Sequence, residues 1–221
     1  MDRLVAAYFI YNAVSVIWLV RSGLPVSLYT GEFPLSLLPV IFYYVGRNLS
    51  FKKDKGMGKL GIAALLVSFM VTFNCLLLFR HQSISELFDI GSRAEHFIAA
   101  VNNMYNTWLG NGLGANGFLA EGLEDAFPVS DGGLIKAYCE QGIFGFSMFI
   151  YILISAFKKG MGDIGKYCIE LGVITAVLVF SGGDVILSFP LAALVFWFAI
   201  GSIYSKITVT DKETEKAGEE E

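Results

Sequence analysis

The chain has 221 residues, of which 55% are hydrophobic and only 16% are charged. Soluble domains carry about 25% charged and about 45–50% apolar residues, so this composition excludes an ordinary soluble globular protein. The net charge of −4 does not indicate a nucleic-acid partner, because residues 206–221 alone hold six acids and three lysines. We expect this polar tail to be disordered and cytoplasmic.

Long hydrophobic runs predict an all-α polytopic membrane protein with about six transmembrane helices. A helix needs about 20 apolar residues to cross a bilayer, and in a helix every backbone polar group is paired within the segment. We expect spans at residues 4–20, 24–45, 60–79, 142–157 (with a start near Leu134), 167–180 and 185–203. Pro34 and Pro39 interrupt the second predicted span, where we expect a kink.

Basic residues set the predicted orientation. They crowd two connections, after the second and the fourth predicted span: Arg47, Lys52, Lys53, Lys55 and Lys59 in one, Lys158, Lys159 and Lys166 in the other. Because loops rich in Lys and Arg stay in the cytoplasm, both termini are predicted to be cytoplasmic. The chain then divides into three spans over residues 1–79, an extracytoplasmic loop over 80–136, and three further spans over 137–205.

The loop over residues 80–136 is the predicted functional part, because a connection of this length needs structure or a function of its own. Ser92 and Glu95 have the spacing of a capping box. Apolar residues follow at helical spacing: Ala94, Phe97, Ile98, Val101, Met104, Tyr105 and Trp108. This pattern predicts an amphipathic helix at the outer membrane surface.

No metal or nucleotide site is predicted. The three cysteines and two histidines do not have ligand spacing, and the sequence contains no P-loop, DxD or HExxH motif. We therefore expect neither a metal nor another cofactor.

Two segments of the chain resemble the O-antigen polymerase and O-antigen ligase family. Residues 91–117, GSRAEHFIAAVNNMYNTWLGNGLGANG, resemble the place in that family where an arginine opens a periplasmic helix that runs into a glycine-rich turn. Residues 131–154, DGGLIKAYCEQGIFGFSMFIYILI, resemble the next signature, which leads through E-x-G into a transmembrane helix. Family members are about twice as long, so the chain resembles their C-terminal half.

The resemblance implies a polysaccharide polymerase that transfers glycan from undecaprenyl diphosphate to an acceptor sugar on the outer face of the bacterial cytoplasmic (inner) membrane. The product would be an O-antigen, a capsule or an exopolysaccharide. Polymerase is favoured over ligase because Ser130-Asp131 stands where many ligases have His-Asn. An O-antigen ligase-like transferase, and a truncated or non-catalytic accessory protein of polysaccharide export, are the alternatives.

The expected partners follow from the same resemblance. They are membrane lipid, an undecaprenyl-diphosphate-linked oligosaccharide, a flippase and a chain-length regulator, and no nucleic acid is expected among them.

The reaction needs a cation for the diphosphate and a base for the acceptor hydroxyl. Arg93 matches the family's loop arginine, its guanidinium can bind phosphate oxygens in pairs, and its place in the first helical turn favours an anion. A headgroup contact is the alternative role. Asp131 is the first candidate for the base and His96 the second, with a polar surface role as the alternative for each.

Five further residues are candidates for substrate binding. The backbone N–H groups of Gly110, Gly112 and Gly114 can line an anion-binding turn, although a glycine-rich connector without ligand is the alternative. Glu140 is expected to orient the return of the loop into the membrane or to bind the acceptor. Arg21, at the outer end of the first span, is a second cation for the diphosphate or a headgroup anchor.

Overall fold

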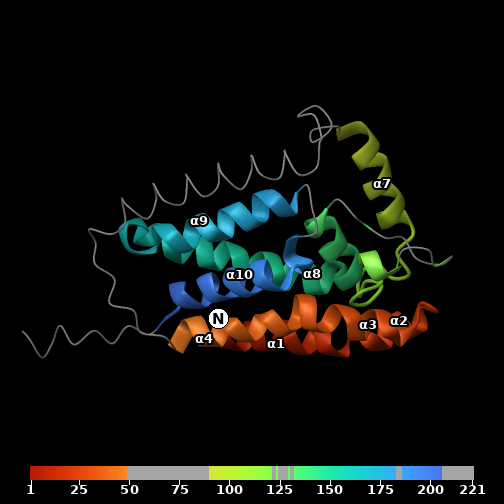
Figure 1. The fold of residues 1–221 in the computed structure, drawn as a ribbon, viewed down its shortest axis with the longest axis horizontal. Coiled ribbons are helices and arrows are strands. Elements are labelled where there is room, and N and C mark those ends of the chain that lie inside the picture. The colour runs from red at the N-terminus through yellow and green to blue at the C-terminus, as the bar shows by residue number, and fades with distance from the viewer. Residues whose placement is uncertain (49–89, 121–122, 124–128, 130–131, 183–185, 206–221) are drawn as a thin grey trace, which may run out of the picture.

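The computed structural model describes residues 1–48, 90–120, 123, 129, 132–182 and 186–205. Within them the chain forms helices and turns and no strand, which confirms the prediction of an all-α polytopic membrane protein (Figure 1). Four helical segments in this part are long and apolar enough to cross a membrane: Asp2–Arg21, Val26–Asn48, Gly133–Gly162 and Ile164–Ser181. Pro190–Ile203 is a shorter apolar helix. The predicted span at residues 60–79 lies outside the described residues.

The first two membrane segments are built from short helices. The first consists of α1 (Asp2–Val14) and α2 (Val16–Arg21), and the second of α3 (Val26–Glu32), a π-helical turn η1 (Phe33–Leu37), a 3-10 turn η2 (Leu38–Ile41) and α4 (Phe42–Asn48). Pro34 and Pro39 fall in the two irregular turns. Because proline has no N–H to donate, each one removes a bond from the helical ladder. The second segment is therefore interrupted over two turns rather than bent at a simple kink.

The remaining elements follow the loop. They are α7 (Ile90–Asn102), η3 (Phe118–Ala120), α8 (Gly133–Gly162), α9 (Ile164–Ser181), η4 (Ile186–Ser188) and α10 (Pro190–Ile203). In Figure 1, α1 to α4 form one layer and α8 to α10 the other, while α7 stands at one end. We call this end of the bundle, which carries Arg21, Gly112 and Ser188, the loop end.

The two layers meet through aromatic rings and small residues. The ring centroids of Tyr8, Phe149, Phe196 and Trp197 lie 5.5 to 6.3 Å from their neighbours. On α10, a Cβ atom at Gly201 would lie 2.0 Å from the carbonyl oxygen of Tyr43 on α4. Helix α10 therefore packs backbone to backbone on α4, as small residues allow between membrane helices.

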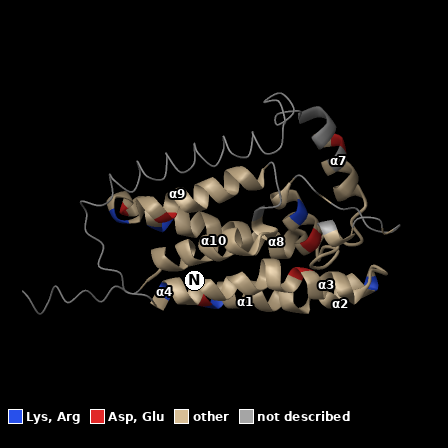
Figure 2. Cartoon of the chain, in the orientation of Figure 1, with Lys and Arg blue, Asp and Glu red and all other residues tan. Residues whose placement is uncertain are grey.

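The outer faces of the bundle are apolar. Ile10 on α1, Ile154 on α8 and Leu191 on α10 are 60%, 61% and 74% exposed. Figure 2 shows long uncharged stretches of helix, with charged residues at helix ends and at the start of α8. Such faces are suited to contact lipid.

The amphipathic helix of the loop is present but shorter than predicted. Helix α7 ends at Asn102, and the side chain of Asn106 accepts hydrogen bonds from the N–H groups of Trp108 and Leu109. Asparagine side chains compete with the helical ladder in this way. Tyr105 and Trp108 therefore follow the helix instead of extending its apolar face, and each is 58% exposed.

Candidate functional site

The glycine loop (residues 110–117) enters the bundle at the loop end and packs against three helical segments. Gly110, Gly112 and Gly114 have φ angles of 77°, 93° and 89°. A Cβ atom at these positions would lie 2.3 Å from Glu140 O, 2.7 Å from Ser15 O and 2.5 Å from Leu28 O, respectively. Both the positive φ and the close backbone contacts require glycine. The three glycines thus fit the loop between α1, α3 and α8.

A break in α8 provides the hydrogen bonds that hold the loop. Gly142 has φ 61° and ψ −172° inside the helix. Nearby, the N–H groups of Asn111 and Gly112 donate to the carbonyl oxygens of Cys139 and Glu140, at 2.9 and 3.0 Å. The N–H groups of the glycine loop therefore donate to carbonyl groups that a regular helix would use for its own backbone hydrogen bonds.

The carboxylate of Glu140 anchors the same loop from the side. Its Oε1 accepts hydrogen bonds from the N–H groups of Gly114 and Asn116, at 3.1 and 3.3 Å. This contact agrees with the expectation that Glu140 orients the return of the loop into the membrane.

The predicted phosphate cradle needs a correction. The N–H group of Gly110 donates to Asn106 O at 2.7 Å, and those of Gly112 and Gly114 are used by Glu140. All three N–H groups are engaged inside the protein, so they are not free to bind a phosphate in this structure.

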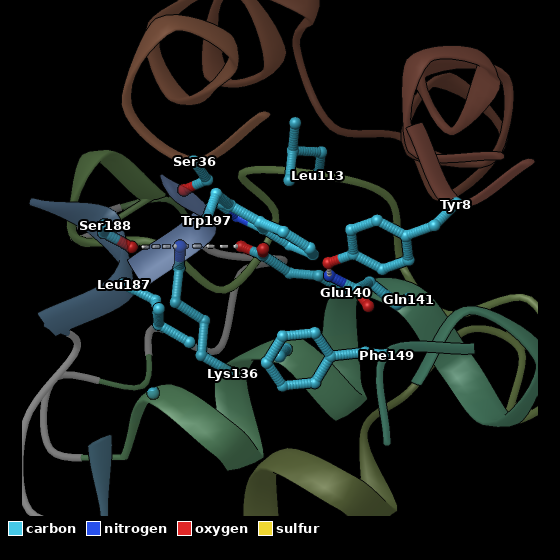
Figure 3. A pocket seen from close by; sticks show the side chains of 12 residues that line it. Tyr8, Ser36, Leu113, Lys136, Glu140, Gln141, Phe149, Leu187, Ser188 and Trp197 are labelled. Atoms are coloured by element: carbon cyan, nitrogen blue, oxygen red, sulfur yellow. Dashed lines mark hydrogen bonds and ion pairs between the residues drawn. The ribbon is translucent and has the colours of Figure 1, made fainter. Parts of the chain in front are cut away.

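Glu32, Lys136 and Glu140 form a buried ionic cluster beside the loop. Figure 3 shows Lys136 and Glu140 of this cluster. The Nζ atom of Lys136 lies 2.5 Å from Glu32 Oε1 and 3.5 Å from Glu140 Oε1. The three residues are only 1%, 4% and 2% exposed. Charged groups buried in a membrane bundle are costly and mark functional sites.

Two serines complete the hydrogen bonds of the cluster. Lys136 donates to Ser188 Oγ at 2.7 Å, and Ser188 Oγ donates to Glu32 Oε1 at 2.9 Å. Ser36 Oγ donates to the same carboxylate oxygen. The cluster thus joins α3 and the adjoining η1 to α8 and η4, which are far from them in the sequence.

A partly open cavity of about 40 Å³ adjoins the cluster (Figure 3). Its wall includes Tyr8, Leu113, Gln141, Phe149 and Trp197 besides Lys136, Glu140 and the two serines, whereas Glu32 lies behind this wall. Gln141 Nε2 donates to Tyr8 Oη at 2.9 Å, whereas Gln141 Oε1 is buried and has no hydrogen-bond partner among the described residues. The cavity therefore combines aromatic walls with an unsatisfied polar atom.

The residues predicted to perform the chemistry lie at the edge of the described structure. Arg93 and His96 lie on α7, but their side chains are outside the described parts, as is Asp131 as a whole. Phe97, one turn after Arg93, lies close to Gly132: a Cβ atom there would be 2.7 Å from the Phe97 ring. Helix α7 therefore packs against the chain segment that leads into α8.

Arg21 is exposed at the end of α2, at the loop end. This position fits either of its predicted roles, as a second cation or as a headgroup anchor.

The prediction from sequence missed Glu32 and Gln141 and gave Lys136 no role. One signal was available for Glu32, because it is an acid inside a predicted membrane span, and such residues indicate function. Another was available for Lys136, which lies four residues before Glu140 and so on the same helical face. No pattern in the sequence around Gln141 indicates a functional role for it.

Comparison of the chain with protein-family models, with curated proteins and with solved structures finds no match in any of the three. What the site can do is therefore inferred from its geometry and from the two segments that resemble the polymerase and ligase family.

Proposed function

We propose that the chain is a polysaccharide polymerase, a membrane glycosyltransferase that transfers glycan from undecaprenyl diphosphate to an acceptor sugar. One observation carries the proposal: the two segments that resemble the family are joined to each other by hydrogen bonds. Asn111 and Gly112 of the first segment donate to carbonyl groups of the second, and Glu140 of the second accepts from Gly114 of the first. An accidental likeness of two glycine-rich segments gives no reason for these residues to be partners.

In the proposed reaction, the oxygen of the acceptor hydroxyl forms a bond to the anomeric carbon of the donor glycan. The bond between that carbon and the diphosphate oxygen breaks, and undecaprenyl diphosphate leaves with the bonding electrons. Arg93 stabilises the negative charge that develops on the diphosphate. Asp131, or His96 in its place, takes the proton of the acceptor hydroxyl.

The proposal places the loop end on the outer face of the bacterial cytoplasmic membrane, with both termini in the cytoplasm. Arg47, Lys158, Lys159 and Lys166 lie at the opposite end, and the basic sequences of the two connections support this orientation. A flippase would supply the lipid-linked oligosaccharide there, and a chain-length regulator would act on the product.

One observation favours a second candidate function, a non-catalytic role in export. Glu32 is a buried charge directly before η1 and η2, the two turns that interrupt the second membrane segment. Buried charges beside discontinuous helices are typical of membrane carriers. An export protein would move lipid-linked glycan across the membrane without forming a sugar bond.

Deletion of the gene separates these functions on a gel of the host's surface glycan. Loss of a polymerase leaves a single repeat unit on the acceptor and removes all longer bands. Loss of a ligase removes every band from the acceptor and leaves polymer on the lipid carrier. Loss of an export protein removes the surface glycan in both forms, and an unchanged ladder contradicts all three functions.

Arg93→Ala tests the site within the same experiment. The variant is expected to reproduce the deletion at a normal protein level, because the diphosphate loses its cation. Arg93→Lys is the matched control, since it keeps the charge but loses the paired hydrogen bonds, and it should restore part of the ladder. A full ladder in Arg93→Ala would remove Arg93 from the proposed site.

A further inference from the structure

We propose that the cavity beside Glu32, Lys136 and Glu140 is the acceptor subsite, and that it takes the hydroxyl-bearing edge of the acceptor sugar. This inference rests on the proposed function. It assigns the acceptor to residues that the resemblance does not mark, apart from Glu140. It also separates the acceptor from the diphosphate, which is assigned to Arg93.

The charge of the cavity determines which kind of ligand it can take. Two carboxylates face one ammonium group, so the cluster carries one formal negative charge when all three groups are ionised. The three N–H donors of Lys136 already have three oxygen atoms within 3.5 Å, on Glu32, Ser188 and Glu140. The cluster residues that line the cavity are Ser36, Lys136, Glu140 and Ser188, and both serines already donate to Glu32. This part of the wall therefore offers mainly acceptors, which repel a phosphate and suit the O–H donors of a sugar.

Gln141 supplies an observation independent of the charged cluster. The residue is 6% exposed and lines the cavity, and its Oε1 has no partner among the described residues. Exchanging the two amide atoms would leave the nitrogen unpaired in the same place. Buried polar atoms are almost always hydrogen-bonded, so this atom lacks a partner. It is closed to a water-sized group as the side chain stands, and a ligand hydroxyl would pair with it after the Gln141 side chain turns toward the cavity that it lines.

The size and walls of the cavity fit the edge of a sugar. Its volume of about 40 Å³ holds about three water-sized groups, at roughly 10–15 Å³ for each. Ligand hydroxyls can replace such waters when they make the same hydrogen bonds. Phe149 and Trp197 provide apolar walls for the C–H groups of the sugar, and Leu113 of the glycine loop borders the same space.

Helix α8 places this subsite next to the proposed diphosphate site. Lys136 and Glu140 face the cavity, whereas Ile135, Tyr138 and Cys139 belong to the cluster that packs on α7. Arg93 lies on α7. The first turns of α8 therefore lie between the acceptor cavity and the helix that carries the proposed cation. The edge of the sugar held in the cavity is accordingly not the one with the reacting hydroxyl, which must reach the carbon bonded to the diphosphate.

The test is a binding measurement on the full chain in lipid nanodiscs. The probe is the host's repeat-unit oligosaccharide, released from its lipid carrier by mild acid. It has the hydroxyl groups of an acceptor but lacks the diphosphate of a donor, so it cannot use the contacts that Arg93 makes to the diphosphate. Isothermal titration gives its Kd, and the tryptophan fluorescence of the chain, to which Trp197 in the cavity wall contributes, gives a second readout.

Gln141→Met removes the amide and nearly keeps the length of the side chain. We expect it to weaken oligosaccharide binding by about tenfold, the effect of one hydrogen bond of about 1.4 kcal/mol. Ser181→Ala is the matched control, because Ser181 is buried in α9 but does not line the cavity, and its Kd should equal that of the wild type. Arg93→Ala should also bind the oligosaccharide normally.

Several results would overturn the inference. One is a Kd of Gln141→Met equal to that of Ser181→Ala, and another is displacement of the oligosaccharide by undecaprenyl diphosphate. The displacement test uses the wild-type chain, so it stands even if the variant does not fold. Absence of binding to the wild-type chain would mean that the cavity holds only water or a cation.

The surface glycan distinguishes this failure from that of the proposed function. If deletion shortens the glycan to one unit but Gln141→Met binds normally, only the acceptor subsite is wrong. If deletion leaves the ladder unchanged, the proposed function is wrong and the acceptor assignment is wrong with it.

Discussion

Lys136→Met should destabilise the protein more than any other single lysine substitution in the described part of the chain. The ammonium of Lys136 is the cation between Glu32 and Glu140, 2.5 and 3.5 Å from their carboxylate oxygens. Methionine keeps most of the apolar stem but leaves two carboxylates buried without a cation between them. Breaking a buried ion pair costs about 3–5 kcal/mol, which in a chain of this size lowers Tm by on the order of 10 °C.

The assay is thermal unfolding of the purified protein in nanodiscs, with tryptophan fluorescence as the signal. Lys158→Met is the control, because Lys158 lies on the same helix but is exposed, and exposed substitutions change the stability by about 0.5 kcal/mol or less. Equal Tm values for the two variants would refute the inference that Lys136 neutralises the cluster.

A double variant tests whether the charges of Glu32 and Lys136 stabilise each other. Glu32→Gln combined with Lys136→Met removes one charge of each kind, so we expect it to be more stable than Lys136→Met alone. Residues in one ionic network couple by about 0.5–3 kcal/mol in such cycles. A double variant whose loss of stability equals the sum of the two single losses would mean that the pair does not interact.

Two further substitutions test the glycine loop. Gly112→Ala should lower Tm and abolish the long glycan bands, because the φ angle of Gly112 is 93° and a Cβ atom would lie 2.7 Å from Ser15 O. Gly165→Ala is the control and should leave both readouts unchanged, since a Cβ atom there meets nothing within 4 Å. Identical behaviour of the two variants would contradict the packing of the glycine loop. Glu140→Leu should make the glycine loop sensitive to limited proteolysis, because the N–H groups of Gly114 and Asn116 lose their acceptor. If the loop resists the protease as well as it does in the wild type, Glu140 does not anchor it.

The helices could be predicted from the sequence because their signal is local. Runs of apolar residues define four long helical segments and α10. The apolar spacing after Ser92 predicts α7, but the end of the helix at Asn102 was missed, and so was its start, because α7 already includes Ile90 and Ser92 lies inside it rather than at the N-cap. The interruption of the second segment was anticipated from Pro34 and Pro39, but not its π-helical and 3-10 turns. Their form depends on packing against the other layer.

The site was much less predictable, because its contacts join distant positions. Glu32 and Lys136 are 104 residues apart, and no periodic pattern links them. The glycines were recognised as unusual, yet the acceptors for the N–H groups of Gly112 and Gly114 are the backbone carbonyl and the side chain of Glu140, next to the break at Gly142. A sequence pattern shows that a backbone turn is sharp, but not which groups it will meet.

Formation of a sugar bond by the chain is tested most directly in membranes of the deletion host that contain the wild-type chain or Arg93→Ala at equal levels. The membranes are supplied with lipid-linked repeat units, and the products are weighed by mass spectrometry. We predict products of two or more repeat units with the wild-type chain, one undecaprenyl diphosphate released for each new bond, and single units with Arg93→Ala. Single units alone in the wild-type membranes would contradict the proposed polymerase.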